Sequence, residues 1–215
     1  MQLPIPNRKI AGQWLAKLLQ AESSLKSPIV LALPRGGVPV AYEIAQALNA
    51  PLDLLLVRKL GTPQFPELAM GAIASGGIRV LNQQVLRAYR IKEDDISAVE
   101  TKERTELKRR EQAYRGQRPN PNLTHQNIII VDDGLATGST MKAAIEAIQA
   151  QQPASITVAV PVAPPETIRE LKTKVDRVIC PFQPHNFSSI GQWYEIFSQV
   201  SDNEVKTQLQ QAWQQ

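Results

Sequence analysis

Short apolar runs alternate with amphipathic stretches along most of this chain, and this alternation limits the possible fold more than any other feature. Runs rich in β-branched residues, such as NIIIV at 127–131, are typical of strands that are buried on both faces. Strands that are each followed by a helix form a parallel sheet with helices on both faces. The chain is therefore predicted to be an α/β protein with a central parallel sheet of about five strands. The expected strands are 28–33, 52–58, 127–131, 155–160 and 176–180, and the expected helices are 8–21, 38–48, 137–149 and 165–174.

Composition excludes several classes of protein. Of the 215 residues, 43% are hydrophobic and 20% are charged, which indicates a globular chain with a buried core. The single cysteine, Cys180, excludes a disulfide framework, and at the end of an expected strand it should be buried and unreactive. With only two histidines a protein-built zinc site is not expected, and His185 is expected to be a surface or hydrogen-bonded residue and not an acid or base. The net charge of +4 suits a phosphate-bearing small ligand, and no nucleic-acid partner is expected.

The chain also gives an expectation about its compartment. No segment approaches the roughly 18 apolar residues that span a bilayer. The first residues, MQLPIPNRKIAGQW, lack the charged start and apolar run of a signal peptide. We therefore expect a cytoplasmic protein with no membrane partner.

Three segments depart from the alternation. Residues 59–77 hold glycines and prolines and are expected to form a long loop with a β-hairpin, and long loops inside compact domains are usually functional. Residues 93–118 read as a charged surface helix, with glutamate–arginine pairs four residues apart at Glu100–Arg104, Glu106–Arg110 and Glu111–Arg115. Residues 181–215 hold six of the eleven Phe, Trp and Tyr residues and are expected to form a small aromatic subdomain with a final helix. The predicted organisation is a core over 1–180 and a C-terminal segment over 181–215.

The string DDGLATGST at 132–140 carries the clearest chemistry. Two carboxylates end a hydrophobic strand, and a loop rich in Gly, Ser and Thr then opens a helix. A helix N-terminus offers free N–H groups to a phosphate, and hydroxyl side chains add donors. The paired acids would repel that phosphate unless they bind sugar hydroxyls or a magnesium ion. The string therefore predicts a sugar-phosphate site, whereas the simpler role of capping the next helix accounts for only part of it. No Walker A loop or GxGxxG fingerprint occurs in the chain.

These residues resemble a known family. IIIVDDGLATGST at 128–140 is similar to the phosphoribosyl pyrophosphate (PRPP) motif of the type I phosphoribosyltransferases. LALPRGGVPVAYEIA at 31–45 resembles the family's pyrophosphate loop with its following helix, and VRKLGTPQFPELAMGAIASGG at 57–77 resembles its flexible catalytic loop. The most similar group has the signatures LPRGGVPVA, VRKLG, VDDGxATG and an aromatic segment near the C-terminus, and its acceptor is unassigned. The resemblance implies the type I fold, with a flexible β-hairpin loop at about 59–77 and, over 181–215, a small C-terminal hood followed by the final helix.

The resemblance, read with the chemistry of the side chains, gives each candidate residue a role. It implies a Mg²⁺-dependent transfer of 5-phosphoribose from PRPP to a nitrogenous acceptor, with release of pyrophosphate. Glu67 could pair with a neighbouring cation or assist proton transfer. The catalytic candidates are Asp132, Asp133, Lys59, Arg58 and Glu67; the 5′-phosphate candidates are Ala136, Thr137, Gly138, Ser139 and Thr140; the pyrophosphate candidates are Arg35, Gly36 and Gly37; the acceptor candidates are Phe187, Trp193 and Tyr194; and Asp132 and Asp133 would hold Mg²⁺ indirectly, through ribose hydroxyls or water.

One position bears on the acceptor. Family members that act on 6-oxopurines carry an aspartate where this chain has Ala136, so a purine-like base other than a 6-oxopurine is favoured. The family also implies a homodimer. Two alternatives stay open: a regulator that binds PRPP or a nucleotide without turnover, and a domain that acts only with another enzyme, such as a hydrolase. The presence of Arg35, Arg58, Lys59 and Glu67 favours catalysis.

Overall fold

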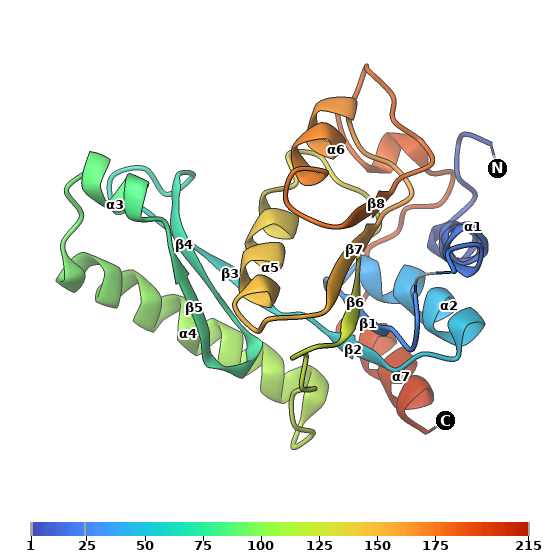
Figure 1. Ribbon diagram of the computed structural model, residues 1–215, viewed down its shortest axis with the longest axis horizontal. Helices are drawn as coiled ribbons and strands as arrows, with labels where there is room; N and C mark the ends of the chain where they lie inside the picture. The colour runs from blue at the N-terminus through green and yellow to red at the C-terminus, as the bar shows by residue number, and fades with distance from the viewer. Residues whose placement is uncertain (1, 24, 215) are drawn as a thin grey trace.

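The computed structural model describes residues 2–23 and 25–214. Its centre is a five-stranded sheet in the order β2-β1-β6-β7-β8, and all neighbouring strands are parallel (Figure 1). The predicted α/β class and the five-stranded parallel sheet are therefore confirmed. The strands are β1 (Ile29–Ala32), β2 (Leu52–Leu54), β6 (Asn127–Val131), β7 (Ser155–Ala159) and β8 (Arg177–Ile179).

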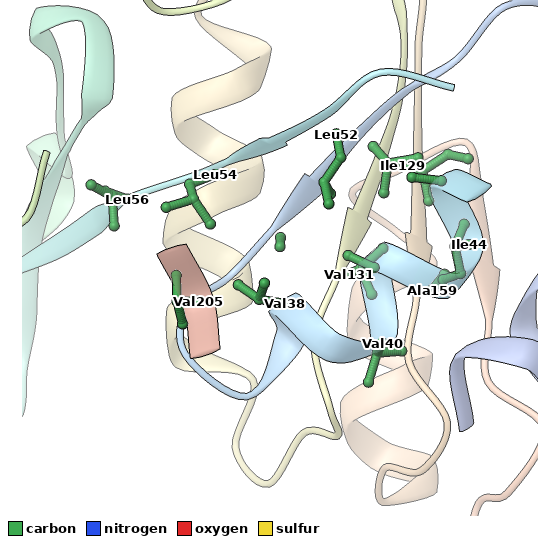
Figure 2. Packing of buried hydrophobic residues seen from close by; sticks show 14 of the residues in the cluster. Val38, Val40, Ile44, Leu52, Leu54, Leu56, Ile129, Val131, Ala159 and Val205 are labelled. Carbon is green, nitrogen blue, oxygen red and sulfur yellow. The ribbon is translucent and has the colours of Figure 1, made fainter. Parts of the chain in front are cut away.

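Alternation along the central strands divides the core into two layers. Side chains of successive strand residues point to opposite faces of a sheet. In β6, Ile129 and Val131 therefore enter one hydrophobic cluster, and Ile128 and Ile130 enter the other. Figure 2 shows the first cluster, where Ile129 and Val131 lie with Val38, Val40 and Ile44 of the adjacent helix and with Val205 of the last helix.

Helices cover both faces of the sheet, as predicted. The first face is covered by α1 (Arg8–Gln20), α2 (Gly37–Leu48) and α7 (Asp202–Trp213), whose buried residues belong to the first cluster. The second face is covered by α5 (Ser139–Gln149) and α6 (Pro165–Leu171) (Figure 1). Strands β1 and β6 each lead into a helix start, which places the 33–36 and 132–138 loops at the same edge of the sheet.

The β-hairpin predicted in the segment 59–77 is confirmed, with bounds Ala69–Ala74 and Ile78–Leu81, whereas the predicted strand 52–58 is corrected by the structure. The core strand β2 ends at Leu54, and a separate strand, β3 (Val57–Gly61), starts three residues later. It pairs antiparallel with β4 (Ala69–Ala74), which pairs with β5 (Ile78–Leu81). The apolar run LDLLLVR concealed this break because Leu55 and Leu56 are both buried, in different clusters. We call this three-stranded sheet the flap; it extends away from the core at the left of Figure 1.

A long charged helix joins the flap to the core. It is α4 (Glu93–Arg115), preceded by a short helix, α3 (Gln83–Ala88), which the sequence pattern did not indicate. The predicted ion pairs Glu100–Arg104 and Glu106–Arg110 form. Arg115 instead turns inward and pairs with Asp53 of β2, with 2.9 Å between Nη2 and Oδ1. Within the described residues no helix is both long enough and apolar enough to cross a membrane.

The C-terminal segment packs against the start of the chain. The Ile5 amide donates to the Trp193 carbonyl at 2.7 Å, and the Glu195 amide donates to the Ile5 carbonyl at 2.8 Å. A short 3₁₀ helix, η2 (Gly191–Trp193), lies in this segment. The predicted final helix is α7, which packs beside α2 and α4. The division of the chain at residue 180 stays a prediction, and we keep the name hood for residues 181–201.

Candidate active site

The two loops singled out in the sequence meet at the carboxyl ends of β1 and β6. The peptide between Pro34 and Arg35 in the first loop is cis. A Cβ atom built on Gly36 would lie 2.0 Å from Oδ2 of Asp133, and one built on Gly37 would lie 2.6 Å from the carbonyl oxygen of Val131. No other residue type fits this approach without movement of the backbone or the acid pair. The structure therefore brings the predicted pyrophosphate loop and the predicted PRPP loop into direct contact.

The loop 134–138 leads into the N-terminus of α5. Gly138 precedes the helix with a φ of +66°, which is a left-handed conformation that favours glycine. The Thr167 hydroxyl donates to the Ala136 carbonyl at 2.7 Å and fixes the loop from α6. The hydroxyls of Thr137 and Ser139 lie 2.9 Å apart. Backbone amides and hydroxyls thus converge at the start of a helix, an arrangement that binds phosphate; Ala136, Thr137 and Thr140 are exposed there.

The two acids differ in their surroundings. Asp133 is buried, and its Oδ2 accepts a hydrogen bond from Nε of Arg8 at 2.8 Å. Asp132 is only half-buried, and its Oδ1 accepts from the Asp133 amide at 2.9 Å. Burial raises the pKa of Asp132, and the neighbouring charge of Asp133 raises it further. Burial also raises the pKa of Asp133, while the Arg8 guanidinium opposes the rise.

Arg8 is a residue that sequence reasoning missed. It opens α1, where the Asn7 side chain caps the helix by accepting from the Ile10 amide at 3.0 Å. In the sequence Arg8 looks like an ordinary surface cation, and no local pattern connects it with a carboxylate 125 residues away. The only hint in the sequence was the amphipathic pattern of residues 8–21. That pattern predicts a helix packed on the core, but it does not show which end of the sheet Arg8 would reach.

Arg58 and Lys59 are successive residues of β3; both line a hollow beside α4, and only Lys59 also lines a cavity beside α5. Arg58 faces α4, and its Nε donates to Glu103 at 2.7 Å. Lys59 and Glu67 line a cavity of about 300 Å³ between the flap and the core, together with Ser139 and Lys142 of α5. Lys59 and Glu67 thus lie beside the start of α5, next to the candidate phosphate loop, whereas Arg58 is turned toward the helix that supports the flap.

Arg35 lies at the rim of the site. Its side chain is 37% exposed, and its Nη1 lies 3.6 Å from Oδ1 of Asp202 at the start of α7. Asp202 also accepts from the Tyr114 hydroxyl at 2.7 Å, and this hydrogen bond lowers the pKa of Asp202. The Arg35–Asp202 pair is loose and exposed, so it leaves the guanidinium able to turn toward an anion at little cost.

The predicted acceptor-binding aromatics do not behave alike. Tyr194 is buried, its ring lies 4.9 Å from that of Phe197, and its hydroxyl donates to the Asp133 carbonyl at 2.6 Å. The Tyr194 ring is thus enclosed in the core, and its predicted contact with an acceptor stays a prediction. Phe187 and Trp193 are half-buried, with ring centroids 6.0 Å apart, and their role toward an acceptor stays a prediction.

The residues at the site fit a magnesium ion that binds together with a phosphate-bearing substrate, and not one held by the protein alone. Within the described residues, no group of three or more His, Cys, Asp or Glu side chains gathers in a way that could hold a metal. Of the two carboxylates, Asp133 is already engaged by Arg8. An ion that brings phosphate oxygens and waters as its own ligands needs only one or two carboxylates, which Asp132 and Asp133 can supply.

Cys180 is buried, as predicted, and His185 is exposed. Burial raises the pKa of the Cys180 thiol to about 12. Because the thiolate is the reactive form, we expect Ellman's reagent at pH 8 to label the folded protein at least about 100-fold more slowly than the urea-unfolded protein. Equal labelling rates in both states would contradict this placement of the side chain.

A parallel sheet that presents a helix N-terminus and paired carboxylates at the carboxyl ends of its strands belongs to the α/β proteins whose ligand site lies at that edge. A family model described as "Phosphoribosyl transferase domain" matches residues 4–195. The chain therefore belongs to the phosphoribosyl transferase family, and the predicted type I fold is confirmed.

Known proteins support this assignment. The "Putative phosphoribosyl transferase Rv0571c" of Mycobacterium tuberculosis is 45% identical over 206 residues, which are 96% of this chain and 46% of that protein. This chain thus spans about half the length of the curated relatives that it matches. A crystal structure of the TT1426 protein from Thermus thermophilus has a TM-score of 0.90 and 38% identity, covering 96% of this chain and 98% of the other. The AQ2163 protein of Aquifex aeolicus shares the fold, with a TM-score of 0.52 and 13% identity over 86% of this chain and 78% of the other.

Proposed function

We propose that this protein transfers 5-phosphoribose from PRPP to a nitrogenous acceptor and releases pyrophosphate. One observation carries the proposal: the acid pair at 132–133 lies between the N-terminus of α5 and the Gly36–Gly37 turn, and it approaches that turn so closely that no Cβ would fit there. A ribose that carries a 5′-phosphate and a 1′-pyrophosphate needs anion sites on both sides of its hydroxyl groups. This arrangement offers both.

The proposed reaction follows from the positions of these groups. A nitrogen lone pair of the acceptor forms a bond to C1 of the ribose, the bond from C1 to the pyrophosphate oxygen breaks with its electron pair, and the proton that the acceptor loses passes to the released pyrophosphate. The ribose becomes positive in the transition state, as in other glycosyl transfers, and the Asp132 carboxylate stabilises that charge. Arg35 and Lys59 offset the negative charge on the leaving pyrophosphate. The flap would close over α5 and exclude water, whose attack is the competing reaction.

Magnesium belongs to the proposal as a partner of PRPP. When bound, it neutralises the pyrophosphate and makes it a better leaving group. The residues that would hold it are Asp132 and Asp133, through ribose hydroxyls or water. A homodimer in the cytoplasm also stays a prediction.

The acceptor is proposed as a purine-like base other than a 6-oxopurine. Ala136 is exposed in the loop and has no group that could hold a ring proton. Phe187 and Trp193 are half-buried aromatic side chains of the hood that could pack on a planar ring. Screening bases and amines for PRPP-dependent release of pyrophosphate would identify the acceptor.

Isothermal titration with PRPP tests the binding half of the proposal. We expect magnesium-dependent binding by the wild type and a Kd about 10- to 150-fold higher for Asp132→Asn, equal to the loss of hydrogen bonds worth about 1.5–3 kcal/mol. Asp94→Asn is the matched control, because Asp94 is an exposed acid on the outer end of α4. Its affinity should equal that of the wild type.

Three outcomes would count against the proposal. No PRPP binding by folded wild-type protein would overturn the site itself. Binding without pyrophosphate release, with every acceptor tried, would favour the regulatory alternative. Activity that appears only after a second enzyme is added would favour a domain that works in association.

A further inference from the structure

We propose that Arg8 is a positioning residue of the phosphoribosyl site, and that it joins the hood to Asp133. This inference rests on the proposed function and assigns unequal roles to the two acids. Asp132 is the carboxylate that meets the ribose, whereas Asp133 is held by the protein. Neither the sequence pattern nor the family match indicates a role for Arg8.

The first support is that Arg8 makes three different contacts from one guanidinium. Its Nε donates to Oδ2 of Asp133 at 2.8 Å, and its Nη1 donates to the Ser198 carbonyl at 2.7 Å. Its Cζ atom lies 3.9 Å from the centre of the Phe197 ring, which is a cation–π contact. A planar fork with several donors can serve all three at once, which an ammonium group cannot do.

The second support is the burial of the pair. The side chains of Arg8 and Asp133 are only 11% and 10% exposed. A buried carboxylate that loses its partner is left as an uncompensated charge. Asp133 would then turn away, which would disturb the turn at Gly36, whose Cα approaches Asp133 too closely to carry a Cβ.

The third support is that the hood reaches Asp133 by a second route. The Tyr194 hydroxyl donates to the Asp133 carbonyl at 2.6 Å, and its ring packs on Phe197, which also contacts Arg8. Asp133 is therefore held through its side chain by α1 and through its backbone by the hood. The segment that would cover the acceptor and the loop that would hold the ribose thus share one set of contacts.

The test is the PRPP affinity of Arg8 variants, measured by titration on protein checked for an intact thermal transition. We expect Arg8→Ala to raise the Kd about 10- to 100-fold, the size of a lost charged hydrogen bond. Arg8→Lys should recover part of this loss, because it keeps the charge without the fork. Lys9→Ala is the matched control, since Lys9 is the neighbouring exposed cation on α1, and it should bind as the wild type does.

A double-mutant cycle separates positioning from general destabilisation. If Arg8 acts through Asp133, the Arg8→Ala/Asp133→Asn double variant should bind PRPP about as weakly as the weaker single variant. Arg8→Ala combined with Ser139→Ala, at the distant end of the phosphate loop, should instead show the product of the two single effects.

The outcomes are distinguishable. A lower Tm for Arg8→Ala with a Kd within about twofold of the wild type would overturn the positioning role and leave the proposed function intact. Full additivity of Arg8→Ala with Asp133→Asn would also overturn it. No PRPP binding by the wild type would overturn the proposed function, and this inference with it.

Discussion

Gly36→Ala is expected to raise the Kd for PRPP roughly 100-fold, equal to about 2.7 kcal/mol, while the protein stays folded. The added methyl carbon would start 2.0 Å from Oδ2 of Asp133, whereas ordinary contacts of a Cβ begin at about 3.4 Å. The turn and the carboxylate must therefore separate by roughly 1 Å or more to reach ordinary contact. Because the two loops are proposed to hold opposite ends of the same ligand, that separation removes contacts from one of them.

Gly116→Ala provides the control for this prediction. Gly116 follows α4 with a φ of +60°, and nothing lies within 4 Å of a Cβ built there. Alanine should therefore bring only backbone strain, of roughly 1–3 kcal/mol, far from the site. We expect a lower Tm and an unchanged Kd. If Gly36→Ala bound PRPP as well as the wild type does, the close approach of the two loops would have no role in binding.

Removing either member of the Asp53–Arg115 pair is expected to lower the free energy of unfolding by about 3–5 kcal/mol. Asp53 and Arg115 are only 5% and 6% exposed, so a lone partner would be left as a buried charge. Arg115 also donates from Nη2 to the Leu54 carbonyl at 2.9 Å. Burial raises the pKa of Asp53, and the guanidinium of Arg115 opposes the rise, so loss of Arg115 would favour the protonated acid. Urea unfolding of Arg115→Met and Asp53→Ala at pH 7 measures the change.

A double variant distinguishes a buried charge from lost packing. Asp53→Leu/Arg115→Met removes both charges and should recover most of the loss, because apolar residues of similar volume often replace a buried pair without cost. Glu93→Ala breaks an exposed pair with Arg79 and should leave the unfolding midpoint unchanged. Equal destabilisation by the single and double variants would show that packing, and not charge, makes the site important.

The side chains of the candidate site could be predicted from the sequence because they belong to short contiguous segments. The run 128–140 contains a buried strand, two acids and a glycine-marked helix start, and each has a local physical cause. The same holds for the Gly36–Gly37 turn, since the strand before it and the helix after it follow from periodicity. Parallel pairing of the strands then requires the two loops to lie at one edge of the sheet.

Partners far apart in the chain could not be predicted in this way. The sequence could not show that Arg8 reaches Asp133, that Arg115 reaches Asp53 or that Tyr194 turns its hydroxyl to the Asp133 backbone. Such contacts depend on how whole elements dock, and one turn of a helix changes which side chain faces inward. The break between β2 and β3 could not be predicted for the same reason. It depends on the pairing of β3 with β4, which the residues of β3 alone do not reveal.

The sequence by itself thus determined the α/β class, the parallel sheet and the loop 132–140 with its acids and its helix start, because these follow from periodicity and from short-range backbone chemistry. Tertiary structure alone decided which acid pairs with Arg8, which cation lines the cavity beside α5 and which aromatic rings stay partly exposed. The physical reason is that burial and charge pairing are properties of packed neighbours, and the docking of α1, the flap and the hood brings those neighbours together.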